Sequence, residues 1–284
     1  MTNSSGAITG TSNFSKRAFA FTPVLSWPCP PGTARLDGDQ IHVWSVVLSD
    51  FDSELPQFQA MLSSGERMKA ERFRFSKDRN HYVIRHGILR VILGRYLEQR
   101  PSEIDFCDGR FGKPEIKGDL AGGGLNFNDS HSGDLAVYAV TRACPLGVDV
   151  EKLRPVPDFE EIASWFFSPR EAETLMALPS ERQMEAFFAC WTRKEAFLKA
   201  TGEGIGEGLA KVEVTLTPGE EAEILRIAGD SQAQTEWQLR SFSPAPGYLA
   251  AVAFRDHNLV LSRGESTVSW IKEHNSEVAP LYGL

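Results

Sequence analysis

Two short segments of this sequence constrain its fold more than any other feature. The first, Gly147–Glu151, is an apolar run interrupted by acids at alternating positions. Side chains alternate between the two faces of a strand, so Asp149 and Glu151 are expected to point the same way. The residues before and between these acids are apolar. The pattern therefore predicts a strand with one buried apolar face and one acidic face.

The second segment, Trp191–Lys199, has the spacing of a helix. Trp191, Glu195 and Lys199 lie at positions i, i+4 and i+8, which stack along one stripe of a helix surface. If this helix faces the strand, three carboxylates converge beside one lysine. So much negative charge in a partly buried site requires a bound cation, and carboxylate oxygens favour Mg²⁺ or Mn²⁺. We therefore expect Glu195 and the two acids of the strand to be metal ligands.

Each segment alone has a simpler explanation. Alternating acids also occur on strands whose edge faces solvent, and Glu195 and Lys199 have the i,i+4 spacing of an ordinary helix ion pair. The presence of Trp191 and Phe197 on the same helix indicates that it packs inward. The two segments together favour a site over two solvated surfaces.

Composition excludes several classes of protein. The 284 residues can form one large domain or two smaller ones, and the 42% hydrophobic and 24% charged residues are typical of soluble globular proteins. A formal net charge of −8 argues against nucleic-acid binding, and the absence of an apolar run of about 18 residues argues against a membrane span. The four cysteines lack metal-site spacing, so we expect reduced thiols in the cytoplasm.

Periodicity and turn residues predict the remaining elements. Strands are expected at Ile41–Leu48, as two strands within Leu125–Val140, and at Val212–Leu216, Glu236–Phe242 and Tyr248–Phe254. Helices are expected at Glu66–Phe75, Asp78–Leu97 and Asp158–Phe166, from the capping signal at Ser168 onward, and at Glu181–Ala200. Residues 1–38, rich in Ser, Thr, Gly and Pro, are expected to be a disordered or loosely docked arm, and residues 257–284 a C-terminal tail. The order of elements looks duplicated.

The paired segments, at this separation, resemble the signature of the 4′-phosphopantetheinyl transferases. The match is to the larger, single-chain class, the surfactin-synthetase-activating type, and extends from about Ile41 to about Arg255. The resemblance implies an α/β (α+β) fold, a pseudo-twofold tandem repeat of two similar α/β halves with the active site in the cleft between them. Residues 39–145 would form the coenzyme A-binding half and residues 146–256 the metal and catalytic half.

The resemblance also implies which residues contact coenzyme A. Ser130 and His131 match positions that contact its phosphate groups, Lys113 and Pro114 match a turn whose lysine neutralises the nucleotide end, and Lys69 matches a basic residue that grips the 3′-phosphate. The simpler alternatives are an ordinary turn at Lys113 and a solvated helix face at Lys69. Further basic residues that could assist are Arg67, Arg85, His86 and Arg90. The segment from Asn126 to His131 departs from the family pattern at Asp129, which replaces an apolar residue.

The activity implied is transfer of the 4′-phosphopantetheine arm of coenzyme A to a serine of an acyl, peptidyl or aryl carrier domain, with release of adenosine 3′,5′-bisphosphate. Mg²⁺, or Mn²⁺, would be held by Asp149, Glu151 and Glu195. Glu195 would be the general base, with Glu151 as the alternative, and Lys199 would bind coenzyme A and stabilise or protonate the departing phosphate. We expect a monomer that binds neither nucleic acid nor membrane. Two alternatives remain open: a non-catalytic module that binds coenzyme A or a carrier protein, and a Mg²⁺-dependent phosphodiesterase or nuclease.

Overall fold

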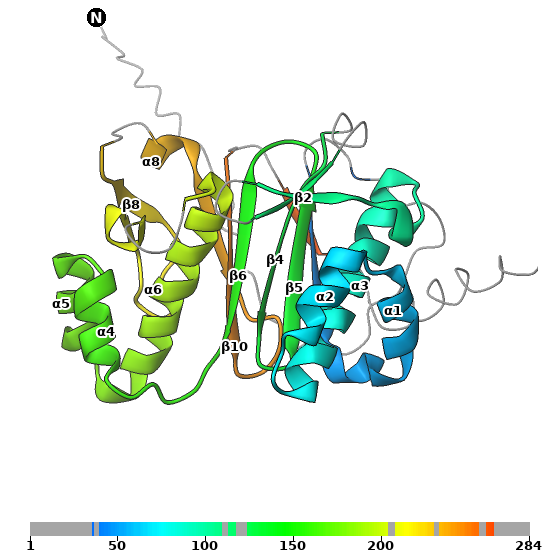
Figure 1. Ribbon diagram of the computed structural model, residues 1–284. Helices are drawn as coiled ribbons and strands as arrows, with labels where there is room; N and C mark the ends of the chain where they lie inside the picture. The colour runs from blue at the N-terminus through cyan, green and yellow to red at the C-terminus, as the bar shows by residue number, and fades with distance from the viewer. Residues whose placement is uncertain are drawn as a thin grey trace, which may run out of the picture.

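A strand that is buried at every position must be covered on both faces, and the mostly apolar strand β5 (Leu135–Thr141) is such a strand. In the computed structural model, one face of β5 packs against helix α3 (Ser76–Leu97) and the other against a second sheet. The result is four layers, with two sheets inside and helices on both outer sides (Figure 1). The structure describes residues 36, 40–109, 113–117, 124–203, 208–229, 233–255 and 260–263.

The first sheet has the strand order β11-β1-β5-β4. Its strands are β1 (Gln40–Val47), β4 (Asn126–Ser132), β5 and β11 (Val260–Arg263). Strand β5 pairs antiparallel with β1 and β4, whereas β11 pairs parallel with β1. The sequence placed Leu36 in the N-terminal arm and Val260–Arg263 in the C-terminal tail. In the structure both belong to the first half, because Leu36 is buried in its core and β11 lies in its sheet.

Helices α1 (Leu55–Met61), α2 (Ser64–Glu71) and α3 cover the outer face of the first sheet (Figure 1). A Cβ on Gly87 of α3 would collide with the Phe58 side chain, so this glycine permits α1 to cross α3 closely. Helix α2 begins at a capping box and ends at Glu71, so the predicted extension to Phe75 was wrong. Sequence reasoning did not find α1, nor the short elements η1 (Leu48–Glu54), η2 (Pro101–Glu103), β2 (Phe106–Asp108) and β3 (Pro114–Ile116).

The second sheet has the order β6-β10-β9, formed by β6 (Leu146–Lys152), β10 (Tyr248–Phe254) and β9 (Gln238–Phe242). The long helix α6 (Ser180–Thr201) packs on its outer face. Helix α5 (Pro169–Ala177) starts at the predicted Ser168 capping box, which is confirmed. The remaining elements of this half are α4 (Phe159–Phe166), η5 (Leu209–Lys211), β7 (Val212–Val214), β8 (Ile224–Ile227) and α8 (Ala233–Glu236).

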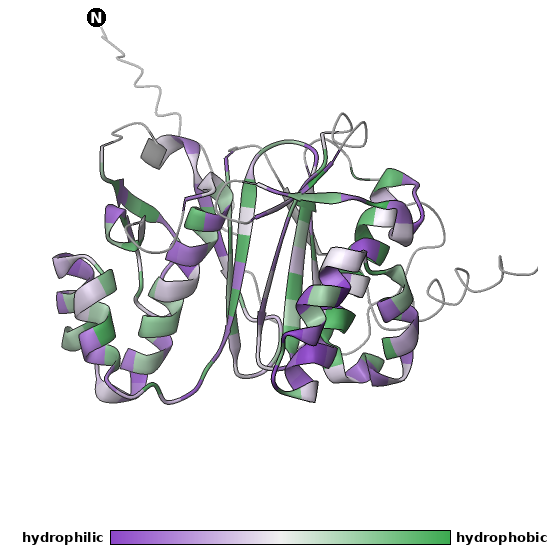
Figure 2. Ribbon diagram, in the orientation of Figure 1, coloured by the Kyte–Doolittle hydropathy of each residue, from purple (hydrophilic) through white to green (hydrophobic). Residues whose placement is uncertain are grey.

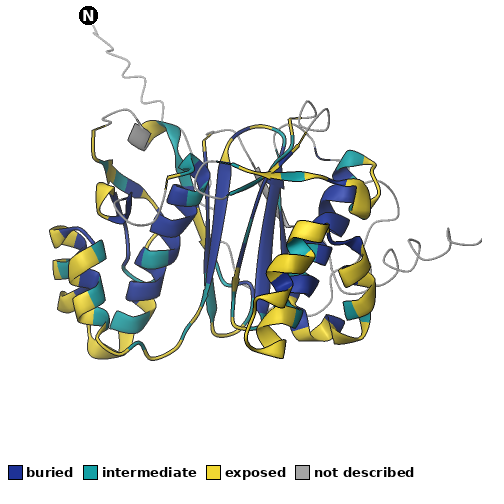
Figure 3. Cartoon of the chain, viewed as in Figure 1, coloured by how far each residue is buried: buried dark blue, intermediate teal, exposed yellow. Residues whose placement is uncertain are grey.

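The inner faces of the two sheets share one apolar cluster, to which Val43 and Val137 contribute from one sheet and Val148 and Val252 from the other. The central strands are mostly apolar and buried, whereas the helices expose their polar faces (Figures 2 and 3). The expected α/β fold with two halves is confirmed. No helix within the described part of the chain has the length and apolar character needed to cross a membrane.

Candidate active site

Strand β4 lies between β5 and β6 (Figure 1). Its sequence places polar residues on both of its faces. Asn128, Ser130 and Ser132 alternate along it and contact β6. The side-chain oxygen of Asn128 accepts a hydrogen bond of 2.8 Å from the backbone N–H of Val148, and the Ser132 hydroxyl donates one of 2.7 Å to Glu151. Side chains thus connect the two halves at the point where their sheets meet.

Ser130 and Lys199 both contact Asp149, a buried acid at the point where the two sheets meet. The Asp149 Oδ1 atom accepts hydrogen bonds from the Ser130 hydroxyl at 2.8 Å and from the Lys199 ammonium at 2.7 Å. Its Oδ2 atom is buried and has no hydrogen-bond partner among the described residues. Because an unpaired buried carboxylate oxygen is costly, such an atom indicates an additional ligand. The orientation of Asp149 leaves that oxygen available.

Gly147 determines how closely α6 approaches this acid. A Cβ at Gly147 would collide with the backbone of Ala196 and of Ala200 on α6. The helix therefore lies directly against β6, on the face from which Asp149 projects. The predicted convergence of the strand and the helix follows from this contact, since Glu195 and Lys199 occupy the same stretch of α6.

Glu195 is buried on α6, and its pKa departs from the ordinary value of a glutamate. Burial, followed by the charge of Asp149, raises the pKa of Glu195 to about 7; Glu151 adds to the rise and Lys199 opposes it. The three acids are therefore close enough to repel one another. A carboxylate that titrates near neutral pH can serve as a general base.

The carboxylates of Asp149, Glu195 and Glu151 fit a hard divalent cation. No ready-made group of three metal-binding side chains occurs among the residues that the structure describes. Mg²⁺, however, usually keeps several water ligands and binds through one or two carboxylates. Asp149 supplies an unpaired oxygen and Glu195 supplies a carboxylate whose ionisation a cation would favour. Glu151 is less free, because its Oε2 atom already accepts from Ser132 at 2.7 Å and Arg154 at 3.3 Å.

Lys113 connects the two halves rather than facing an open surface. Its ammonium donates hydrogen bonds of 2.9 Å to the backbone oxygens of Leu146 and Lys199. Burial lowers the pKa of Lys113 to about 8, with Lys199 contributing and Glu115 opposing. Pro114 follows as the first residue of β3. The Gly112 that precedes this turn in the sequence lies outside the described residues.

The other face of β4 carries His131 and Asp129 toward α3. Arg85 of α3 donates to the Nδ1 atom of His131 at 2.7 Å and lies 3.5 Å from an Asp129 oxygen. Lys69 is exposed on α2, and its ammonium lies 5.8 Å from the centre of the Tyr82 ring. His131 and Lys69 therefore flank α3, whereas Ser130 and Lys199 belong with the acids.

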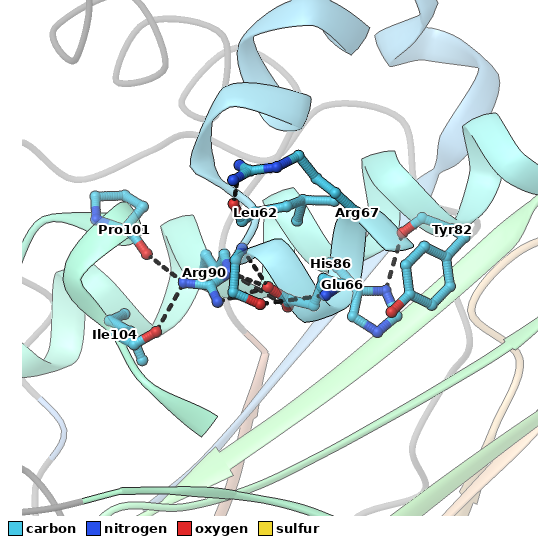
Figure 4. Close-up of polar contacts among 9 residues, drawn as sticks. Leu62, Glu66, Arg67, Tyr82, His86, Arg90, Pro101 and Ile104 are labelled. Atoms are coloured by element: carbon cyan, nitrogen blue, oxygen red, sulfur yellow. Dashed lines mark hydrogen bonds and ion pairs between the residues drawn. The ribbon is translucent and has the colours of Figure 1, made fainter. Parts of the chain in front are cut away.

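Arg90 cannot assist in phosphate binding, and that suggestion from the sequence was wrong. Its side chain is only 1% exposed, pairs with Glu66 at 2.6 Å, and donates to the backbone oxygens of Pro101 and Ile104 (Figure 4). Arg67 likewise donates to the backbone oxygen of Leu62, although it remains exposed (Figure 4). A buried arginine of this kind stabilises the helix layer.

Sequence reasoning assigned no role to three residues that build the site, namely Asn128, Ser132 and Gly147. The alternation of polar residues in Asn126–Ser132 was the available signal for the first two, because it places them on one face of a strand. The available signal for Gly147 was its lack of a side chain in a strand, which often marks a close backbone approach.

Comparisons with known proteins agree with this geometry. A family model described as "4′-phosphopantetheinyl transferase, N-terminal" matches residues 45–143, and one described as "4′-phosphopantetheinyl transferase superfamily" matches residues 145–253. The 4′-phosphopantetheinyl transferase HetI of Nostoc sp. is 41% identical over 80% of this chain and 93% of its own. The chain belongs to the 4′-phosphopantetheinyl transferase family. Another member, Sfp of Bacillus subtilis, is 30% identical over 70% of this chain and 84% of its own.

Two further proteins match at lower identity. The L-aminoadipate-semialdehyde dehydrogenase-phosphopantetheinyl transferase of Homo sapiens is 28% identical over 67% of this chain and 66% of its own. A solved holo-(acyl-carrier-protein) synthase from Bacillus anthracis, in complex with CoA (3′,5′-ADP), matches 40% of this chain and 96% of its own at 21% identity, with a TM-score of 0.32. The larger, Sfp-like class expected from the sequence is confirmed by the relatives that match both halves.

Proposed function

We propose that this transferase moves the 4′-phosphopantetheine arm of coenzyme A onto a serine of an acyl, peptidyl or aryl carrier domain and releases adenosine 3′,5′-bisphosphate. The reaction would require Mg²⁺, with Mn²⁺ as a possible substitute. The observation that carries the proposal is the buried, unpaired Oδ2 atom of Asp149, beside Glu195 and Lys199 in a chain of this family.

The chemistry is a displacement at the β-phosphorus of coenzyme A. The serine oxygen forms a bond to that phosphorus, and the bond to the oxygen shared with the α-phosphorus breaks. Glu195, in its ionised form, takes the serine proton. Lys199, already 2.7 Å from Asp149, offsets charge on the departing phosphate or gives it a proton. Glu151 is the alternative acceptor of the serine proton.

Asp149 and Glu195, with Glu151 directly or through water, would hold the metal ion. When bound, Mg²⁺ offsets negative charge on the pyrophosphate. Ser130 orients Asp149 through its 2.8 Å hydrogen bond, so the oxygen left for a ligand is fixed before any ligand arrives. We propose Lys69, Lys113, Pro114, Ser130, His131 and Lys199 as the residues that bind coenzyme A.

The two halves would divide this work. Residues 39–145 supply most of the proposed coenzyme A contacts, and residues 146–256 supply the carboxylates. Residues 1–38 and 257–284 would be an arm and a tail outside the catalytic unit, apart from Leu36 and β11, which belong to the first half. We propose a monomer that acts in the cytoplasm.

Mass spectrometry of an apo carrier protein incubated with coenzyme A, Mg²⁺ and this enzyme tests the proposal. We expect the carrier to gain the phosphopantetheinyl mass, and a carrier whose acceptor serine is replaced by alanine to gain nothing. A module that only binds would leave the carrier unchanged, and a phosphodiesterase would consume coenzyme A without modifying the carrier. Either of these outcomes would overturn the proposal.

A further inference from the structure

His131 and Arg85 form a contact that fixes which ring nitrogen of the histidine carries a proton. An arginine guanidinium has only hydrogen-bond donors and stays charged in proteins. The 2.7 Å contact between Arg85 Nη1 and His131 Nδ1 therefore requires that Nδ1 act as the acceptor. The proton of the neutral ring must then lie on Nε2.

Surrounding contacts hold Arg85 in this position. The Asp129 carboxylate lies 3.5 Å from the same Arg85 nitrogen, and it projects from the same face of β4 as His131. Tyr138, the cross-strand partner of Asp129, donates a 3.0 Å hydrogen bond to the backbone oxygen of Arg85. The acid at position 129, which departs from the family pattern, thus faces the arginine that contacts the histidine.

We propose that Arg85 is a positioning residue that holds His131 neutral with its proton on Nε2, so that the ring meets the phosphate oxygen of coenzyme A as a hydrogen-bond donor rather than as a cation. Asp129 balances the charge of Arg85. This inference rests on the proposed function for the identity of the anion, but the state of the ring is a property of the free protein.

Four charged or titratable groups face the ring from the elements around it. Arg85 and His86 lie on α3, Asp129 on β4 and Lys199 on α6. Desolvation lowers the pKa of His131 to about 4, with Arg85, Lys199 and His86 contributing to the decrease and Asp129 opposing it. Beside this desolvation, the Arg85 contact opposes protonation of the ring, because it is incompatible with a protonated Nδ1.

The first test measures the ring directly. Long-range ¹H–¹⁵N correlation spectra of the full chain, without metal or coenzyme A, distinguish a protonated ring nitrogen from an unprotonated one. The signals of His131 are identified by their loss in His131→Gln. We expect Nε2 to carry the proton and the ring to remain neutral down to pH 5. A ring that titrates near the ordinary value of about 6.5, or that carries its proton on Nδ1, would overturn the inference.

The second test uses Arg85→Met, which keeps much of the side-chain length but removes the donors, with Arg85→Lys as the matched control that keeps the charge. Because Arg85→Met leaves Asp129 without its cation, Arg85→Met is also combined with Asp129→Asn. We expect the pKa of His131 to rise toward its ordinary value of about 6.5 in both Met variants, because the neighbouring cation is removed. An unchanged titration would show that Arg85 does not control the ring.

Calorimetry with coenzyme A, again without metal, separates positioning from direct contact. His131→Gln should weaken binding about tenfold, as expected for one lost hydrogen bond to a charged group. If Arg85 acts through His131, adding Arg85→Met to His131→Gln should cause no further loss. The ratio of Arg85→Met to wild-type affinity should rise from pH 7.5 to pH 5.5, because a protonated ring then attracts phosphate. A double variant much weaker than His131→Gln would assign Arg85 to direct phosphate binding and refute the positioning role.

The outcomes are independent of the transferase assay. If the carrier is not modified but His131 has the expected tautomer, the proposed function fails and the assignment of the ring stands. If the carrier is modified but His131 titrates normally, the function stands and this inference fails.

Discussion

At the scale of single residues, the raised pKa of Glu195 couples ionisation, stability and metal binding. Between its ordinary value of about 4.3 and the folded value of about 7, the folded state binds more protons at Glu195 than the unfolded state does. In metal-free protein, stability from this group is therefore lost as the pH rises through that window. The loss amounts to at most about 4 kcal/mol. A bound cation reverses it, because the cation favours the ionised carboxylate.

Glu195→Gln tests this coupling. The substitution keeps the size of the side chain and one ligating oxygen but removes the charge and the basicity. We expect Mg²⁺ to raise the Tm of the wild type more at pH 8 than at pH 6, and this pH dependence to disappear in the variant. Turnover of a carrier protein should fall far more than coenzyme A binding measured by calorimetry. If turnover and binding fall in step, Glu195 is a ligand only, and Glu151 becomes the candidate base.

Asp149→Asn tests whether the unpaired Oδ2 atom of Asp149 binds the metal ion. The substitution keeps one side-chain oxygen that can accept from Ser130 and Lys199. It replaces the second carboxylate oxygen by an NH₂ group and removes the negative charge. We expect the Mg²⁺-induced rise in Tm to be lost, and the pKa of Glu195 in the metal-free variant to fall, since the charge of Asp149 no longer raises it. The same Mg²⁺ response in the variant as in the wild type would contradict the assignment of Asp149 as a ligand.

At the scale of elements, the contact of α6 with β6 at Gly147 brings the acids together. We expect Gly147→Ala to cost about 1 to 3 kcal/mol of unfolding free energy, as overpacking typically does, because the colliding atoms belong to the helix backbone. Activity should fall further than the unfolded fraction explains, since α6 carries Glu195 and Lys199. Gly65→Ala on α2 is the matched control, because its nearest contact is a serine oxygen at 4.0 Å. Equal stability of the two variants in urea denaturation would refute the close approach.

At the scale of the whole molecule, Leu36 is the first of the described residues in the core of the first half, and it is 8% exposed. Deleting residues 1–35 should therefore leave transferase activity and Tm close to those of the full chain, because these residues are rich in small polar residues and carry no recognised motif. Deleting residues 1–36 is the paired variant, and it should lower Tm by removing a core side chain. A large loss of Tm in the shorter deletion would show that residues 1–35 add to the core.

The sequence by itself determined the local elements and their faces. Alternation predicted that Asp149 and Glu151 share one side of β6, the 3.6-residue period predicted that Glu195 and Lys199 share one stripe of α6, and Ser168 marked the start of α5. Such predictions succeed because the period of a strand or helix, and the hydrogen-bonding needs of its first turn, are properties of neighbouring residues.

The tertiary structure alone decided the partners of these faces. In the sequence Arg90 looks like a basic residue available to an anion, yet it is buried and donates to the backbone oxygens of Pro101 and Ile104. The contacts of Lys113 with the backbone oxygens of Leu146 and Lys199 likewise come from segments distant in the chain. The pairing of β11 with β1 joins residues far apart in the chain, and short strands of this kind have little local signal. The raised pKa of Glu195 and the tautomer of His131 likewise depend on burial and on charges from other elements, and no local period encodes these.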